Sequence, residues 1–355
     1  MSSPYRESSA EIDRKRNPLI IGSRGSALAL WQTNWALDRL RECAPDAQFA
    51  IETIKTQGDR TQAHNTPLAQ LGDKGLFVAE LERALLAGDL DVAIQPMNDH
   101  ALAVAEAAMQ TQPTIQPLDA AVHSLKDLPS VVTDGLTLAA ITEREDARDA
   151  LVSRQGYTLA ELPEGAIVAT GSLRRRAQLL HLRPDLRIVE IRGNVDTRLR
   201  KTLAPDGPDA TILAAAGLRR LGLAEYITEL LSIETLVPAA GQGALAVETR
   251  ADDLRARKLL RRLDHLPTRR AVSAERAVLA TLGGGCRVPL GAHAIPSADG
   301  ATLRLLAVVA SPDGKQFIRV ERAGAAQRPV QLGRQVAREL LRQGAGEIVR
   351  AVLGR

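Results

Sequence analysis

The chain alternates between strand-like and helix-like segments from Leu19 to about Ala246. Short apolar runs with strand character are separated by longer segments with helical periodicity. Strands are predicted at Leu19–Gly22, Phe49–Lys55, Ala120–His123, Leu136–Ile141, Ala166–Ala169, Arg187–Ile191 and Ala210–Ala215. Such alternation is typical of α/β proteins, in which helices cover the faces of a sheet. The sequence therefore predicts an α/β fold for this part of the chain.

Polar or glycine residues directly follow several of these predicted strands. The strand ends are Ser23-Arg24, Ser124-Leu125-Lys126-Asp127, Thr170-Gly171-Ser172 and Arg192-Gly193-Asn194. Ligands of open α/β sheets bind at the carboxyl ends of the strands, and helix N-termini at that edge favour anions. We therefore expect an anion-binding site that is built from these strand ends.

Arginine supplies most of the local positive charge. Between Arg174 and Arg220 there are ten arginines and one lysine, Lys201. The guanidinium fork binds carboxylate or phosphate in a bidentate manner. Aromatic residues make up only 2% of the chain, so stacking platforms for single-stranded nucleic acid are nearly absent. No helix-turn-helix or zinc pattern is present either. Charge alone leaves both a nucleic acid and a small polycarboxylate open as ligands.

The segment that follows has a different pattern. Helices are predicted at Asp252–Leu263 and Thr268–Leu282, strands at Thr302–Ala310 and Gln316–Ala323, and a last helix at Val330–Gln343. The chain has 355 residues, which corresponds to two or three domains. We interpret this final segment as a separate small α/β domain.

The chain has no apolar run of the length that a membrane span requires. Residues Met1–Asn17 are polar and charged and lack the apolar core of a secretory signal. We expect them to form a disordered tail, and we expect a cytoplasmic protein that does not bind membranes.

Two motifs carry candidate chemistry. Gly283-Gly284-Gly285-Cys286 presents a thiol after a helical segment, and the glycines let this loop approach another surface closely. The other cysteine, Cys43, lies in a predicted helix, so a disulfide framework is not expected. Cys286 is therefore a candidate nucleophile or attachment point.

The second motif is Lys126-Asp127, directly after a predicted strand. Lys126 could form a Schiff base with a carbonyl compound or a pyridoxal cofactor. Alternatively, Asp127 could stabilise a cationic intermediate or shuttle a proton while Lys126 binds an anion. The residues alone leave both alternatives open.

Nine motifs in one order resemble a known family, the hydroxymethylbilane synthases, also called porphobilinogen deaminases. The resemblance covers about residues 18–323. The motifs are Ser23-Arg24-Gly25-Ser26-Ala27-Leu28-Ala29, Lys55-Thr56-Gln57-Gly58-Asp59, Gly72-Asp73-Lys74-Gly75-Leu76-Phe77, His123-Ser124-Leu125-Lys126-Asp127, Gly171-Ser172-Leu173-Arg174-Arg175, Arg192-Gly193-Asn194-Val195, Ala216-Gly217-Leu218, Pro238-Ala239-Ala240-Gly241-Gln242-Gly243 and Gly284-Gly285-Cys286-Arg287-Val288-Pro289.

The resemblance implies an enzyme that condenses four porphobilinogen molecules head to tail with release of ammonia, then frees the linear tetrapyrrole by hydrolysis. It implies a dipyrromethane cofactor joined by a thioether to Cys286, and no metal. It also implies a monomer with three domains after the tail at 1–17. Domain 1 would comprise 18–142 and 238–260, and domain 2 would comprise 143–237; both resemble a type II periplasmic binding protein. Domain 3, at 261–355, would carry the cofactor.

The resemblance also implies roles for individual residues. Asp127 would be the catalytic carboxylate that stabilises positive charge on the pyrrole nitrogen. Residues that would bind the cofactor or the substrate are Arg24, Ser26, Phe77, Ser124, Lys126, Thr170, Ser172, Arg174, Arg175, Arg192, Asn194, Arg198, Arg220, Gln242 and Gly243.

The chain departs from the family pattern in one stretch, Asp91–Leu118, where 28 residues intervene before the His123 motif. We expect a surface insertion that leaves the activity intact, because loops tolerate insertions well. Alternatively, the insertion could cover the cleft or contact a partner. Three other functions are alternatives: a binding module without chemistry, a nucleic-acid-binding protein, and a pyridoxal-dependent lyase that uses Lys126.

Overall fold

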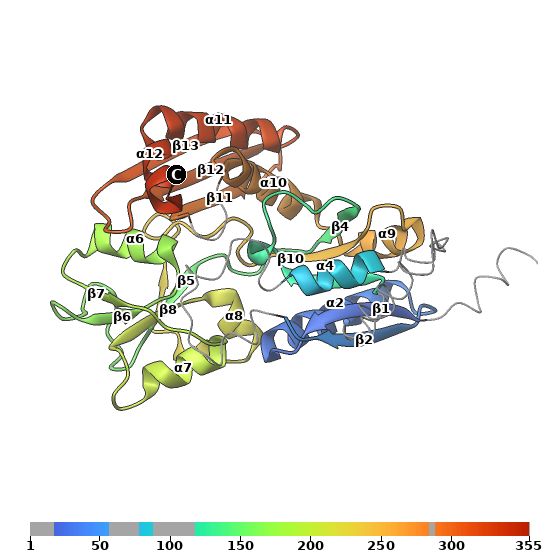
Figure 1. Cartoon of the computed structure of the whole chain (residues 1–355), viewed down its shortest axis with the longest axis horizontal. Helices are drawn as coiled ribbons and strands as arrows, with labels where there is room; N and C mark the ends of the chain where they lie inside the picture. Colours follow the sequence, from blue (N-terminus) through green and yellow to red (C-terminus); the bar gives the residue numbers. More distant parts are fainter. Residues whose placement is uncertain (1–17, 57–77, 88–117, 284–287, 355) are drawn as a thin grey trace, which may run out of the picture.

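The computed structural model describes residues 18–56, 78–87, 118–283 and 288–354. The described chain forms three units, each built around its own β-sheet (Figure 1). The tail at 1–17, most of the insertion, Phe77 and Cys286 lie outside the described residues. None of the helices in the described part of the chain combines the length and the apolar character of a membrane span.

The first unit contains a five-stranded sheet in the order β2-β1-β3-β10-β4. Its strands are β1 (Leu19–Arg24), β2 (Phe49–Ile54), β3 (Ala120–Ser124), β4 (Leu136–Ile141) and β10 (Leu245–Arg250). β1 pairs in parallel with β2 and β3, whereas β10 is antiparallel to both β3 and β4. The helices are α2 (Ala27–Cys43), α4 (Ala79–Leu86) and α9 (Leu254–Leu260). Apolar residues of the sheet, α2 and α9 form the core of this unit.

The second unit repeats this topology, with the order β7-β6-β8-β5-β9. Its strands are β5 (Asp149–Ser153), β6 (Ile167–Ala169), β7 (Arg187–Val189), β8 (Ala210–Ala214) and β9 (Glu229–Leu231). β5 is the antiparallel strand, and it occupies the place that β10 has in the first sheet. The helices are α6 (Leu173–Leu182), α7 (Val195–Leu203) and α8 (Ala215–Arg220). Two crossovers connect the two sheets: the first comprises residues 142–148 and the second residues 232–244. Two α/β units with the same strand order agree with the fold class expected from the sequence.

The third unit is a three-stranded antiparallel sheet packed against helices. Its strands are β11 (Leu290–Pro296), β12 (Thr302–Ala310) and β13 (Phe317–Ala325), and its helices are α10 (Leu266–Thr281), α11 (Pro329–Arg342) and α12 (Ala345–Leu353). One apolar core joins all six elements. The small α/β domain predicted from the sequence is therefore present, with β11 and α12 as additional elements. The helix predicted at Asp252–Leu263 does not belong to it, because α9 packs in the core of the first unit.

Glu275 on α10 fastens the third unit to the crossovers between the other two. Its carboxylate is fully buried and accepts bonds of 2.6 and 3.0 Å from the Arg144 guanidinium. It also accepts from the backbone N–H groups of Gly241, at 2.7 Å, and Ala294, at 2.8 Å. Because Arg144 and Gly241 lie on different crossovers, one carboxylate fixes both of them relative to α10, the helix that precedes the Cys286 loop.

The third unit also contacts the second unit through α6. The His181 ring stacks on Phe317 of β13 with centroids 4.0 Å apart. The His181 Nδ1 atom lies 3.1 Å from the carbonyl oxygen of Gly314. A Cβ atom at Gly314 would lie 2.5 Å from the His181 backbone nitrogen, so only glycine permits this approach. α6, which carries Arg174 and Arg175, is thus held at its C-terminal end by the third unit.

Candidate active site

The Lys126-Asp127 pair lies in a short 3-10 helix, Leu125–Asp127, directly after β3. Leu125 is fully buried, and its backbone N–H donates to the carbonyl of Ala244 at 3.0 Å. On the preceding residue, the Ser124 hydroxyl accepts a 2.9 Å bond from Gln32 of α2. Apolar anchoring and these two bonds therefore fix the turn that presents Lys126 and Asp127.

The second unit contributes to the site through the residues around Ser172, at the start of α6. Its side chain caps α6 by accepting a bond from the backbone N–H of Arg175, as the sequence predicts for Thr170 or Ser172. The Thr170 hydroxyl accepts from the backbone N–H of Ser172 at 3.2 Å and shapes the turn before the helix. The cap places Arg174 and Arg175 in the first turn of α6.

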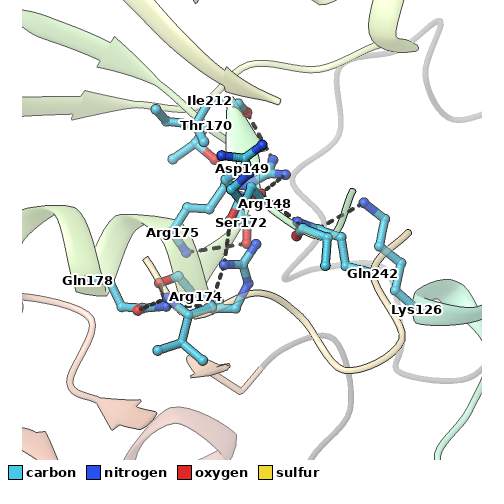
Figure 2. A network of polar contacts seen from close by, with 12 residues as sticks. Lys126, Arg148, Asp149, Thr170, Ser172, Arg174, Arg175, Gln178, Ile212 and Gln242 are labelled. Carbon is cyan, nitrogen blue, oxygen red and sulfur yellow. Dashed lines mark hydrogen bonds and ion pairs between the residues drawn. The ribbon is translucent and has the colours of Figure 1, made fainter. Parts of the chain in front are cut away.

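Both guanidiniums bind Asp149, a fully buried residue at the start of β5 (Figure 2). Arg174 Nη1 and Arg175 Nη2 each lie 2.7 Å from a different Asp149 carboxylate oxygen. Arg174 also donates to the carbonyl of Val237, and Arg175 donates to that of Ile212. Burial alone raises the pKa of Asp149, but the two guanidiniums outweigh burial and hold that pKa well below its usual range. Asp149 therefore stays ionised.

Gln242 extends this network from the second unit to the first. Its Nε2 donates to Asp149 at 2.9 Å and to the carbonyl of Ala147 at 2.8 Å. Its Oε1 accepts a 3.3 Å bond from Lys126 Nζ (Figure 2). A single amide thus connects the Asp149 carboxylate to the Lys126 ammonium across the boundary between the two sheets.

Lys126 carries its charge in a partly buried position without an ion pair among the described residues. Burial, followed by repulsion from Arg175, lowers its pKa to about 8. Its bond to the neutral Gln242 amide cannot replace a carboxylate. An anionic ligand would supply the missing countercharge.

Three more predicted arginines add positive charge. Arg192 is paired with Glu190 through Nε at 3.1 Å, but its buried Nη2 atom has no hydrogen-bond partner among the described residues. Arg198 Nε donates to the Gly193 carbonyl, and burial together with Arg175 and Arg192 lowers the pKa of Arg198 to about 10. Arg220 Nη2 donates to the Gly243 carbonyl at 2.7 Å, and burial lowers its pKa to about 10.

The remaining predicted binding residues lie at the ends of helices and strands or on a crossover. Ser26 caps α2 and Asn194 precedes α7, while Arg24 ends β1. Gly243 has a φ of +90°, and a Cβ there would lie 2.3 Å from the Glu145 carbonyl oxygen, so the crossover requires glycine. Phe77 and Cys286 lie outside the described residues.

Asp149, which binds both Arg174 and Arg175, was not predicted from the sequence. The available signal was an acidic residue at the head of the apolar run Ala150–Val152. A charged group at the start of a fully buried strand needs a partner, and α6 offers two. The sequence also gave no indication that Trp31 lies beside Arg220, with the guanidinium 5.8 Å from the ring centre.

Comparisons with known proteins match this architecture along most of its length. Residues 19–114 and 103–258 match the family model described as "Porphobilinogen deaminase, dipyromethane cofactor binding domain", and residues 269–342 match "Porphobilinogen deaminase, C-terminal domain". A porphobilinogen deaminase of Brevibacillus brevis is 46% identical over 333 residues, covering 94% of this chain and 97% of that protein. The chain belongs to the porphobilinogen deaminase family. The family expected from the nine motifs is therefore confirmed.

Other similar proteins include a porphobilinogen deaminase of Roseiflexus castenholzii, which is 47% identical over 93% of this chain and 97% of that protein. Among solved structures, the methionine binding protein MetQ matches 69% of this chain and 89% of its own, with 14% identity and a TM-score of 0.37. The two segments that match the first porphobilinogen deaminase model overlap at 103–114. The overlap lies within the stretch 91–118, which is thus unusual relative to this family model as well.

Replacing Asp149 by asparagine should destabilise the protein strongly. The amide cannot neutralise two buried guanidiniums, and breaking a buried pair costs about 3–5 kcal/mol. We expect the free energy of unfolding in urea at pH 7 to fall by about that amount. Because the pKa of Asp149 is lower in the folded state, its contribution is full above about pH 4 and declines in stronger acid. The exposed Asp46→Asn is the matched control, and equal losses in both variants would contradict the assignment.

Substrate affinity should depend on the charge of Lys126. Because its pKa is lowered to about 8, the ammonium is mostly protonated near pH 7 and loses its proton as the pH rises through 8. We expect KM for an anionic substrate to rise above about pH 8. Lys126→Arg should remove this rise, because arginine stays charged. A KM that changes with pH in the same way in both enzymes would rule out Lys126 as its origin.

Proposed function

We propose that the site between the first two units binds the carboxylates of porphobilinogen and of the growing pyrrole chain. Family membership makes the chain a transferase of tetrapyrrole biosynthesis, a porphobilinogen deaminase or hydroxymethylbilane synthase. In this reaction four porphobilinogen molecules are condensed head to tail, ammonia leaves at each step, and hydrolysis releases the linear product. The observation that supports the assignment of the site is its uncompensated positive charge.

The charge count explains why polycarboxylates suit this site. Each porphobilinogen brings an acetate and a propionate, so every added ring adds two negative charges. Asp149 can neutralise only one of the two guanidiniums that it binds. Lys126, Arg198 and Arg220 have no carboxylate within ion-pair distance among the described residues. Substrate carboxylates would supply the charge-assisted bonds that these partly buried cations lack.

Asp127 is the candidate catalytic group. When porphobilinogen loses ammonia, positive charge develops on the pyrrole nitrogen, and a nearby carboxylate lowers the barrier to that step. Asp127 follows Lys126 in the 3-10 helix after β3, at the carboxyl edge of the first sheet. The ammonium of Lys126 would bind a substrate carboxylate and so align the pyrrole with Asp127. This chemistry needs no imine, which disfavours Lys126 as a Schiff-base residue.

The residues of the site fit a dipyrromethane cofactor, the group that the family model names. Its four carboxylates require several cations, and the buried Nη2 of Arg192 together with Arg198 can serve as their partners. When bound, the cofactor supplies the pyrrole carbon to which the first substrate is joined. We propose Cys286 as its attachment point, because α10 and Gly283 lead directly to that loop.

The proposal includes the domain boundaries 18–142 with 238–260, 143–237 and 261–355, and a monomer that acts in the cytoplasm without nucleic acid. Two arginines of the cluster that suggested nucleic acid are bound to Asp149 inside the protein. They are therefore not part of a phosphate-binding surface. A pure binding module would leave Asp127 and Cys286 without a role.

The mass of the intact protein tests the cofactor attachment. We expect the purified protein to exceed its sequence mass by two linked pyrrole units, and Cys286→Ala to lack this excess. Cys43→Ala is the matched control, since it removes the other cysteine and should keep the excess. If both proteins have the bare mass, incubation with porphobilinogen should load only the protein that has Cys286. Failure to load would overturn the assignment of Cys286.

Asp127→Asn tests the catalytic assignment. The amide keeps the shape of the side chain but removes the negative charge, so kcat for ammonia release should fall at least about 100-fold. KM should change little, because Asp127 does not bind the carboxylates. Asp134→Asn, in the same loop region, should retain full activity. A kcat for Asp127→Asn within a few-fold of the unchanged enzyme would exclude Asp127 as the stabilising group.

A further inference from the structure

Arg220 occupies an unusual position at the boundary between the first two units. It ends α8, and its Nη2 donates to the carbonyl of Gly243 on the second crossover. The neighbouring Arg219 is fully paired, since it binds Glu145 at 3.0 Å and Asp146 at 3.1 Å. Arg220 instead has only a neutral partner and an aromatic ring among the described residues.

The ring belongs to Trp31 on α2, in the opposite unit. The Arg220 guanidinium carbon lies 5.8 Å from the ring centre, within the range of a cation–π interaction. α2 and α8 lie side by side at this point (Figure 1). Trp31 is 38% exposed, so burial in an apolar core does not explain its position.

α2 is firmly connected to the candidate active site. Its next residue, Gln32, is buried and bonds to the Ser124 hydroxyl, two residues before Lys126. Thr33 is also buried and donates to the Ser23 hydroxyl at the end of β1. Trp31 therefore stands on a helix whose position is fixed by the same residues that fix the Lys126 turn.

We propose that Trp31 is a positioning residue for substrate binding, whose ring holds the Arg220 guanidinium in the orientation that receives a carboxylate of porphobilinogen. The proposal rests on the proposed function of the site. The Gly243 carbonyl accepts a bond from one of the five N–H groups of Arg220, and this single bond leaves the guanidinium able to turn. The Trp31 ring beside it limits that motion. A bound carboxylate would then meet an oriented partner, at a smaller loss of side-chain freedom.

The chain offers a direct optical test, because it contains only two tryptophans, Trp31 and Trp35. Trp35 packs against the core of the first unit and serves as the matched control. In Trp35→Phe, the remaining Trp31 emission should change saturably as porphobilinogen is added. In Trp31→Phe, the Trp35 emission should stay constant. A constant Trp31 emission, or equal changes in both variants, would overturn the proposal.

Kinetics separate positioning from a structural role. Trp31→Ala should raise KM about two- to fivefold and leave kcat within twofold, while Trp31→Phe, which keeps a ring, should restore most of the affinity. In an Arg220→Ala background, Trp31→Ala should add no further increase in KM. An equal KM increase with and without Arg220 would show that Trp31 does not act through it.

The outcomes also distinguish this proposal from the proposed function. If the unchanged protein, shown by its mass to carry the cofactor, releases no ammonia from porphobilinogen, the proposed function itself is wrong. If the unchanged protein is active and Trp31→Ala has the same KM and the same thermal stability as the unchanged protein, only the assignment of Trp31 is wrong.

Discussion

The buried Asp149 carboxylate determines how the site is built. Removing this charge from water is unfavourable, and the two guanidiniums of Arg174 and Arg175 together with the Gln242 amide compensate for it. The four groups come from β5, α6 and the second crossover, so one network fixes all three relative to each other. Through Gln242 it reaches Lys126 in the other unit. The Asp149 network thus determines both the geometry and the charge of the site.

The network leaves the site with more positive than negative charge. A protein that maximised stability would pair each partly buried cation with a carboxylate. Yet desolvation lowers the pKa values of Lys126, Arg198 and Arg220, which have no such partner among the described residues. Local rules of stability are commonly broken at functional sites. Here the broken rule identifies the ligand class, because a substrate that gains two carboxylates with every ring restores the balance of charge.

Much of the fold could be predicted from the sequence, because alternating or well-bounded strands such as β12 and the strong helical periodicity of α11 are local signals. The strands β5 and β10 were missed, since a strand that is buried on both faces lacks the regular alternation of apolar and polar residues. The arginines were recognised as a group. Which of them are neutralised internally was not predictable, because Asp149 lies about 25 positions from its partners and only tertiary folding brings them together.

The central claim is that partly buried cations without an ion-pair partner among the described residues recognise the carboxylates of the substrate. Its most direct test is to compare ammonia release from porphobilinogen with release from its diester, in which both carboxylates are neutral. Charge-assisted hydrogen bonds contribute about 1.5–3 kcal/mol each, so the account predicts that kcat/KM for the diester is lower by at least about 100-fold. A value of kcat/KM within a few-fold of that for porphobilinogen would contradict it.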